Sequence, residues 1–449
     1  MKSRPGTFRR GVHPPENKSL TAELSVKVLP NPAKVLLPLL QHTGRPAELS
    51  VKPRDNVAVG QKIAEPTGLI SAAVHASIAG KVGPLTTTVS AAGLRVPAVA
   101  ITADDSSNSL GPTWPAPGPE QFSSEDFSPE HITEAAQEAG LVGLGGAAFP
   151  THVKLMSNPE RPIDTVILNG CECEPYLTSD YRLMLEEPAW VVRGLLLAIR
   201  ATGAKQGLIA IEDNKPQAIA TMQIAISDCP HLAVQSLQTK YPQGGERSLL
   251  PAAMGRVIPT KGLPLHVGAV VLNVGTAAAL AQAVLSGTAL THRVITVTGE
   301  GIKQPANLLV PIGVTLREVL DYCGGLAEDA AKIIMGGPMM GHTVWDLDLP
   351  VTKGTSGITV LAESQLGYGP ERPCVRCAKC VDHCPIRLNP TSIAHAVKFD
   401  EFELARSLGL EACVECGCCG YICPSRIQLV QYMRSGKAGL RKIEQADKE

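Results

Sequence analysis

The sequence lacks the features that mark nucleic-acid-binding, exported and membrane-spanning proteins. Its formal net charge is -1 and it has no long run of Lys or Arg, so the basic surface of a nucleic-acid binder is not expected. The basic N-terminus, MKSRPGTFRRGVHPPENK, is not followed by an apolar core, which argues against a signal peptide. The most apolar segment, residues 268–290, is interrupted by Asn273, Gln282 and several Gly and Thr residues. It therefore predicts a strand and a buried helix rather than a membrane span.

Cysteine is abundant but unevenly distributed. Nine of the 13 cysteines lie between Cys374 and Cys423 at short, regular spacings. This crowding is typical of metal ligation in a reducing compartment and not of an extracellular disulfide framework. We therefore expect a cytoplasmic protein that reaches a membrane only through a partner.

Composition divides the chain into modules. Residues 1–105 contain short β-like runs between Gly and Pro residues and predict a small all-β module. Residues 106–127 are rich in Ser, Pro and Gly and predict a linker. Residues 128–285 alternate helical and strand patterns, which predicts an α/β domain with a parallel sheet. Residues 286–345 predict short strands around one helix, and residues 346–449 hold the cysteine motifs.

The α/β domain contains two strong local signals. TVILNG, residues 165–170, predicts a buried strand. YRLMLEEPAWVVRGLLLAIRATGA, residues 181–204, predicts one long amphipathic helix.

Two cysteine motifs share one spacing, C-x2-C-x2-C-x3-C-P. The first contains Cys374, Cys377, Cys380 and Cys384, and the second contains Cys413, Cys416, Cys419 and Cys423. In bacterial-type ferredoxins with this spacing, three thiolates bind one [4Fe-4S] cluster and the fourth binds the other. The spacing therefore predicts one cluster held by Cys374, Cys377, Cys380 and Cys423, and a second held by Cys413, Cys416, Cys419 and Cys384.

A pair of zinc sites is the alternative, because C-x2-C pairs are common to both kinds of site. Zinc needs four ligands and does not require a third cysteine followed by x3-Cys-Pro, so the spacing favours clusters. Cys418 is an extra thiol within the second motif. We interpret it as a packing residue, because its use as a ligand would break the spacing.

A glycine loop lies near the start of the α/β domain. AGLVGLGGAAFPTHVKL places Gly143, Gly145 and Gly146 in one loop, with Lys154 after it. Glycines let backbone N–H groups approach a phosphate or a ring closely, and a lysine adds positive charge. A simple tight turn is the alternative explanation.

An acidic segment follows the predicted strand. LNGCECEPYLTSD, residues 168–180, contains Asn169, Glu172 and Glu174. Carboxylates at this place suit hydrogen bonds to a ribose or a nicotinamide amide, and solvated loop acids are the alternative.

These motifs resemble known families. GLGGAAFPTHVK followed by LNGCECEP is similar to the flavin- and NADH-binding loops of the flavoprotein subunit of respiratory complex I. The N-terminal module resembles the barrel-sandwich hybrid of biotinyl and lipoyl carriers, without the lysine that those carriers modify, and VPIGVTLREVLDYCGG resembles a β-grasp (soluble ligand-binding) module. The module order, with GVHPPENK at the start and a two-cluster ferredoxin-like domain at the end, resembles the RnfC (RsxC) family of the ion-translocating Rnf electron transport complex.

The resemblance implies roles for the residues that match its motifs. The positions that hold FMN in the complex I family correspond to Gly143, Gly145, Gly146, Lys154, Asn169, Asn273 and Thr276. Phe149 corresponds to the ring that stacks on the nicotinamide, Glu174 to an acid that contacts NADH, and Glu212 lies near another acidic contact. Glu172 is a further candidate of the acidic segment. Leu144, Cys171 and Tyr176 replace an arginine, an aspartate and a glycine of that pattern.

The resemblance also implies a function. NADH gives up two electrons as a hydride and each cluster accepts one, so FMN between them completes an electron path. Hydride transfer needs no side-chain acid or base, and none is assigned. The expected protein is a peripheral subunit on the cytoplasmic side of a membrane-bound complex. It exchanges electrons between NAD(H) and partner subunits or, indirectly, ferredoxin, coupled to ion translocation. A cobalamin reductase of the propanediol-utilisation type and a non-catalytic iron-sulfur wiring subunit are the alternatives.

Overall fold

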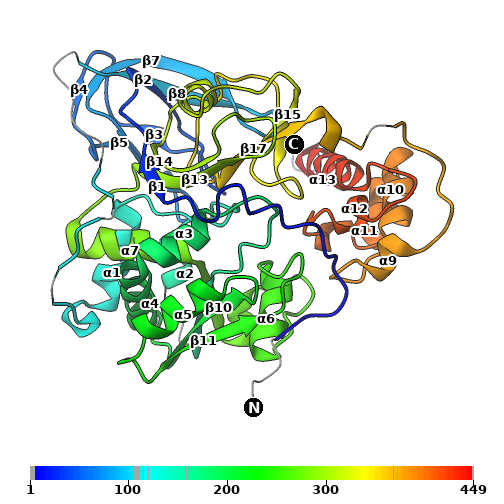
Figure 1. Ribbon diagram of the computed structural model, residues 1–449, viewed down its shortest axis with the longest axis horizontal. Helices are drawn as coiled ribbons and strands as arrows, with labels where there is room; N and C mark the ends of the chain where they lie inside the picture. The colour runs from blue at the N-terminus through cyan, green and yellow to red at the C-terminus, as the bar shows by residue number, and fades with distance from the viewer. Residues whose placement is uncertain are drawn as a thin grey trace.

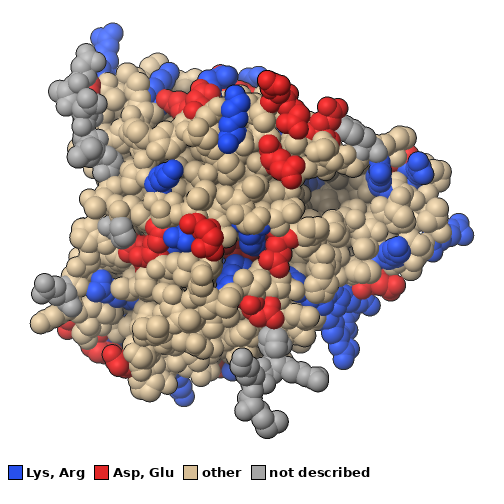
Figure 2. All heavy atoms as spheres, in the orientation of Figure 1, with Lys and Arg blue, Asp and Glu red and all other residues tan. Residues whose placement is uncertain are grey.

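The computed structural model describes residues 6–104, 112–114, 116–119, 121–156, 160–367 and 369–446. Figure 1 shows two sheet-containing halves stacked on each other, with a group of short helices set apart at one end. Part of the predicted linker, residues 106–127, lies outside the described residues. On the face shown in Figure 2, Lys and Arg side chains are interspersed with Asp and Glu.

The N-terminal module consists of two antiparallel sheets. The first has the order β2 (Lys34–Pro38), β8 (Arg95–Thr102), β7 (Gly80–Val89), β4 (Asn56–Val57), and the second β3 (Glu48–Leu49), β5 (Lys62–Glu65), β6 (Val74–His75). Leu37, Val99 and Ile101 are fully buried in this module. Their hydrophobic core continues into the α/β domain, so the two modules pack as one body.

The α/β domain is built on a parallel sheet, as predicted. The sheet order is β11 (Leu232–Leu237), β10 (Gln206–Glu212), β9 (Thr165–Asn169), β12 (Ala269–Asn273). One face packs against α1 (Pro129–Glu138), α4 (Pro188–Thr202), α5 (Pro216–Ala225) and α7 (Val274–Ser286). The other face packs against α6 (Glu246–Met254), and the short α2 (Thr151–Leu155) follows the glycine loop.

The segment predicted as one helix at residues 181–204 forms two helices. α3 (Ser179–Glu186) ends just before Pro188, and α4 begins at that proline. Proline has no N–H to donate and clashes with the preceding turn, so it starts a helix more readily than it continues one. The prediction of a single helix was wrong because it followed the apolar periodicity of the segment and gave too little weight to Pro188.

A six-stranded mixed sheet forms the third module. Its order is β1 (Val26–Val28), β14 (Ala306–Pro311), β13 (His292–Thr298), β17 (Gly357–Ala362), β15 (Ala330–Met335), β16 (His342–Val344), and α8 (Leu316–Tyr322) packs on it. β1 and β17 come from outside residues 286–345. The sheet therefore recruits strands from both flanking segments, and the domain limits given above remain a prediction.

The C-terminal module is a small helical unit. It contains α9 (Lys379–Asp382), α10 (Pro390–Lys398), α11 (Phe402–Ser407), α12 (Cys418–Tyr421) and α13 (Leu429–Ala446). Its core includes Ile393, Leu410 and Met433. Across the residues that the structure describes, no helix is both long and apolar enough to cross a membrane.

An extended N-terminal strap, residues 6–25, runs across the modules (Figure 1). The N–H of Gly6 donates to Ser236 of β11 at 3.2 Å, and the N–H of Gly11 donates to His383 of the helical unit at 3.1 Å. Val12 and Tyr241 exchange two backbone hydrogen bonds of 2.9 Å. The strap then enters the six-stranded sheet as β1, so it links three modules.

Candidate redox site

The candidate residues gather at the carboxyl edge of the parallel sheet. Asn169 ends β9, Asn273 is its register partner at the end of β12, and Glu212 ends β10. Ligands of open α/β sheets bind outside this edge.

The glycine loop, residues 142–150, forms a tight turn. The N–H of Gly143 donates to the carbonyl of the half-buried Phe149 at 2.8 Å. Gly146 has a φ of 109°, which favours glycine, and a Cβ there would meet no atom within 4 Å. Gly145 and Gly146 are exposed, so a ligand can approach their backbone.

Three modules anchor this loop. The N–H of Leu144 donates to the hydroxyl of Thr276 at 2.9 Å, and the buried Arg293 of the six-stranded sheet donates to the Leu144 carbonyl at 3.2 Å. Thr43 of the N-terminal module donates to the carbonyl of Ala147 at 2.8 Å. The structure thus uses Thr276 to position the loop.

Lys154 lies half-buried in α2, directly after the loop. Its Nζ donates to Glu246 at 3.0 Å and to the carbonyl of Val271 at 3.0 Å. The ammonium group is therefore held beside the middle of β12.

Asn169 and Asn273, at the carboxyl ends of β9 and β12, form hydrogen bonds with segments next to the sheet. Asn169 donates to the carbonyl of Gly244 at 2.9 Å, and Asn273 donates to the carboxylate of Asp180 at 2.6 Å. A Cβ on Gly145 would lie 3.4 Å from the Cβ of Asn273, so the glycine loop and β12 meet here.

Two of the acidic candidates turn inward. The carboxylate of Glu172 accepts the N–H groups of Asp180 at 2.7 Å and Tyr181 at 3.2 Å, which caps the first turn of α3. Glu212 forms an ion pair with Lys215 at 3.2 Å, and both side chains are almost completely buried. These carboxylates are engaged in internal contacts.

Glu174 contacts a loop of the third module. Its carboxylate accepts the N–H of Met340 at 2.8 Å and the N–H of Met339 at 3.1 Å. Burial raises the pKa of Glu174 to about 7.

The eight motif cysteines line two separate cavities. Cys384, Cys413, Cys416 and Cys419 line one of them, and Cys374, Cys377, Cys380 and Cys423 line the other. Each cavity thus combines three cysteines of one motif with the fourth cysteine of the other. In the described ranges, no three His, Cys, Asp or Glu side chains converge closely enough to hold a single metal ion.

The two motifs adopt matching backbone conformations. Positive φ angles recur at equivalent positions, namely Arg376 and Glu415, Ala378 and Gly417, and Arg387 and Arg426. The N–H of Arg376 donates to the Sγ of Cys374, and the N–H of Glu415 to the Sγ of Cys413, both at 3.4 Å. Hydrogen bonds to sulfur favour the thiolate form and tune bound clusters. The donor set therefore fits two thiolate-bound clusters.

The two cavities differ in exposure. Cys374 and Cys377 are exposed, and Val375 between them is 67% exposed. Cys384 of the other cavity is buried, and Cys416 is half-buried. Of the two, only the cavity lined by Cys374, Cys377, Cys380 and Cys423 presents two of its cysteines at the surface.

An apolar cluster joins the acidic segment to the second cysteine motif. Its members are Val12, Tyr241 and Cys418, with Cys173, Met339, Cys416 and Ile422 packed against them. Tyr241 is 1% exposed, and its hydroxyl has no hydrogen-bond partner among the described residues. The thiol of Cys418 donates to the Tyr241 carbonyl at 3.9 Å. Although Cys418 also lines the second-motif cavity, this contact favours the packing role.

Sequence reasoning did not identify Lys18, Tyr241 or the Met339–Met340 loop as parts of this region. Lys18 and Tyr241 contact backbone groups far away in sequence, and Met339 and Met340 donate their own N–H groups to the distant Glu174. No local pattern reveals such contacts. The segment GVHPPENK, which contains Lys18, and the segment YPQGGERSLLPAAMGRVIP, which begins with Tyr241, were the available signals.

Four stretches of the chain match known family models. Residues 6–106 match the RnfC barrel sandwich hybrid domain, and residues 136–282 match the Nuo51 FMN-binding domain. Residues 294–343 match the SLBB domain, and residues 368–424 match the 4Fe-4S dicluster domain. These matches confirm the predicted fold class and the predicted FMN and [4Fe-4S] cofactors, and they disfavour zinc.

Three relatives share most of the chain, and each is the C component of an oxidoreductase complex. The one from the Na⁺-translocating ferredoxin:NAD⁺ oxidoreductase complex of Acetobacterium woodii is 43% identical, over 88% of this chain and 88% of its own length. The one from the proton-translocating ferredoxin:NAD⁺ oxidoreductase complex of Clostridium ljungdahlii is 41% identical, over 89% of this chain and 86% of its own. The one from the ion-translocating oxidoreductase complex of Rhodobacter capsulatus is 40% identical, over 90% and 77%.

A matched pair of variants tests the role of Cys418. Cys418→Ala should retain about eight irons per chain, because we interpret this thiol as a residue that packs against Tyr241 and not as a cluster ligand. Cys419→Ala should retain only about four, because it removes one of four thiolates from a cluster. Iron and sulfide would be determined on anaerobically purified protein. Loss of four irons from Cys418→Ala, with Cys419→Ala unaffected, would show that Cys418 is the ligand.

Proposed function

This chain belongs to the RnfC family, the C components of ion-translocating oxidoreductase complexes, and we propose on that basis that it exchanges electrons between NAD(H) and partner subunits or ferredoxin. The path runs through FMN and two [4Fe-4S] clusters. One observation carries the proposal: the acidic segment, through Cys173, and the second cysteine motif, through Cys416 and Cys418, pack in one apolar cluster around Tyr241, beside a cysteine-lined cavity.

The residues at the sheet edge would hold the flavin. Gly145 and Gly146 present an accessible backbone, and Asn169 and Asn273 supply amide groups at the strand ends. Lys154, whose charge is paired with Glu246, would add an N–H donor. A bound flavin supplies the exchange between a two-electron hydride and single electrons, which the clusters carry. Phe149 and Glu174 would then contact the nicotinamide nucleotide.

The cysteine sets suggest an order for the clusters. Cys416 packs in the same apolar cluster as Cys173 of the acidic segment, so the cavity with Cys384, Cys413, Cys416 and Cys419 is the entry site for electrons. The other cavity has two exposed cysteines and is the exit toward a partner.

The proposal includes a peripheral location on the cytoplasmic face of a membrane complex, with partner subunits moving the ion. The relatives' names differ in that ion, Na⁺ in one and the proton in another, although both are about equally similar to this chain. The relatives named above all belong to ion-translocating complexes, so the cobalamin reductase alternative is not favoured.

Anaerobic purification followed by NADH addition tests the function. We expect about eight irons and one FMN per chain, and bleaching of the visible spectrum when NADH is added. Iron without flavin would leave only the alternative of a non-catalytic subunit that relays electrons through its iron-sulfur clusters. A full cofactor content without bleaching by NADH would contradict the nucleotide site.

Glu174 should make the reaction with NADH pH-dependent. Because burial raises its pKa to about 7, the side chain loses its charge, and with it hydrogen-bond acceptor capacity, as the pH falls through 7. We therefore expect kcat/KM for NADH to rise between pH 6 and pH 8 in the wild type, and this step to disappear in Glu174→Gln.

Glu328 is exposed, so Glu328→Gln is the matched control. This variant should keep the wild-type pH dependence of kcat/KM for NADH. An unchanged step near pH 7 in Glu174→Gln would assign the titration to another group.

A further inference from the structure

We propose that Lys18 is the positioning residue that fixes the acidic loop, residues 171–177, for reaction with NAD(H). Lys18 belongs to the N-terminal strap, far in sequence from the site, and the proposed function assigns it no part. The inference rests on that function and deepens it by naming what holds the nucleotide-contacting acid in place.

Lys18 directs all of its hydrogen-bonding capacity to this loop. Its Nζ donates to the carbonyl oxygens of Glu172 at 2.9 Å, Glu174 at 2.9 Å and Leu177 at 2.5 Å. An ammonium group has three N–H donors, so each of them has a partner on one short segment. One side chain thus gathers three carbonyls that would otherwise repel one another.

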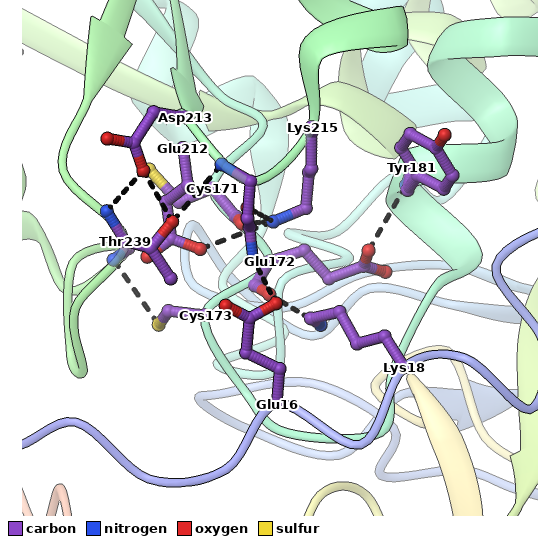
Figure 3. A network of polar contacts seen from close by, with 12 residues as sticks. Glu16, Lys18, Cys171, Glu172, Cys173, Tyr181, Glu212, Asp213, Lys215 and Thr239 are labelled. Carbon is purple, nitrogen blue, oxygen red and sulfur yellow. Dashed lines mark hydrogen bonds and ion pairs between the residues drawn. The ribbon is translucent and has the colours of Figure 1, made fainter.

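A second lysine completes the arrangement from the other side (Figure 3). Lys215 donates to the carbonyl of Cys171 at 2.6 Å and is neutralised by Glu212 at 3.2 Å. Figure 3 shows Lys18 and Lys215 pointing toward the backbone around Glu172 from opposite sides. Four carbonyls of the acidic loop are thus turned toward two ammonium groups.

This arrangement determines where the functional side chains point. With its carbonyl held by Lys18, Glu174 directs its carboxylate to the N–H groups of Met339 and Met340. Cys173, one residue earlier, packs against Tyr241 next to the second cysteine motif. Lys18 therefore positions Glu174, the acid proposed to contact NADH. It also positions Cys173, which packs next to the proposed entry cluster.

The strap does not need Lys18 to stay in place. Val12 and Tyr241 exchange two backbone hydrogen bonds, Gly11 donates to His383, and Tyr176 donates to the carbonyl of Glu16. A substitution at Lys18 therefore removes three contacts between the loop and the strap and leaves the N–H of Tyr176 bonded to Glu16, so it loosens the acidic loop without releasing the strap.

Lys18→Met tests the proposal, because it keeps the aliphatic stem and removes the three donors. Lys18→Arg is the conservative variant, and Lys27→Met removes an exposed lysine of β1 as the matched control. The full-length holoprotein would be assayed for iron, flavin, NADH kinetics and cluster reduction by dithionite, and the exchange of loop amides with deuterium would be followed.

We expect Lys18→Met to raise KM for NADH by about tenfold, because a displaced loop no longer holds Glu174 where it can contact the nucleotide. Iron, flavin and reduction by dithionite should remain at wild-type levels, amides of residues 171–177 should exchange faster, and Lys18→Arg should partly restore KM. Lys27→Met should match the wild type throughout.

Wild-type KM and wild-type amide exchange in Lys18→Met would overturn the proposal. Loss of flavin or iron in that variant would also overturn it, because the residue would then be needed for folding of the site. Failure of the wild type to react with NADH would instead contradict the proposed function, and the exchange measurement would still decide whether Lys18 orders the loop.

Discussion

The packing of Tyr241 between the acidic loop and the second cysteine motif is the contact on which the proposed electron path depends. It brings Cys173 of the α/β domain and Cys416 of the helical unit into one apolar cluster, although more than 240 residues separate them in sequence. Burial of such a cluster excludes water and fixes the two units relative to each other. It places the acidic loop next to the cavity that Cys384, Cys413, Cys416 and Cys419 line.

The rest of the architecture supports this contact. The strap pairs with Tyr241 through Val12, and Arg293 of the six-stranded sheet reaches the glycine loop. Glu174 joins the acidic loop to the Met339–Met340 loop, whose Met340 carbonyl accepts a hydrogen bond from Arg434 of α13 at 3.0 Å. Arg434 in turn pairs with Glu415 of the second motif at 3.1 Å. The site is therefore shared by all four modules rather than contained in one.

Local patterns were sufficient for the features that depend on local physics. The two matched sets of cysteines and the parallel sheet of the α/β domain follow from spacing and periodicity over short windows. The sequence did not reveal that Pro188 divides a helix or that β1 and β17 extend the third sheet. Nor could it show that Glu172 and Glu212 bind partners inside the protein, because those partners, Tyr181 and Lys215, are selected by tertiary packing. Lys18 donates to backbone carbonyls, which every residue has. Such a contact does not depend on the identity of the accepting residue, so the sequence does not reveal it.

The order of the clusters is the central claim, and it can be tested by removing one cluster at a time. Freeze-quenched samples mixed with NADH would be examined by electron paramagnetic resonance. In Cys380→Ala, which retains the entry cluster, NADH should reduce the remaining cluster at the wild-type rate. In Cys419→Ala, which retains only the exit cluster, reduction by NADH should be strongly slowed while dithionite still reduces the cluster. Rapid reduction by NADH in Cys419→Ala, with slow reduction in Cys380→Ala, would contradict the assigned order.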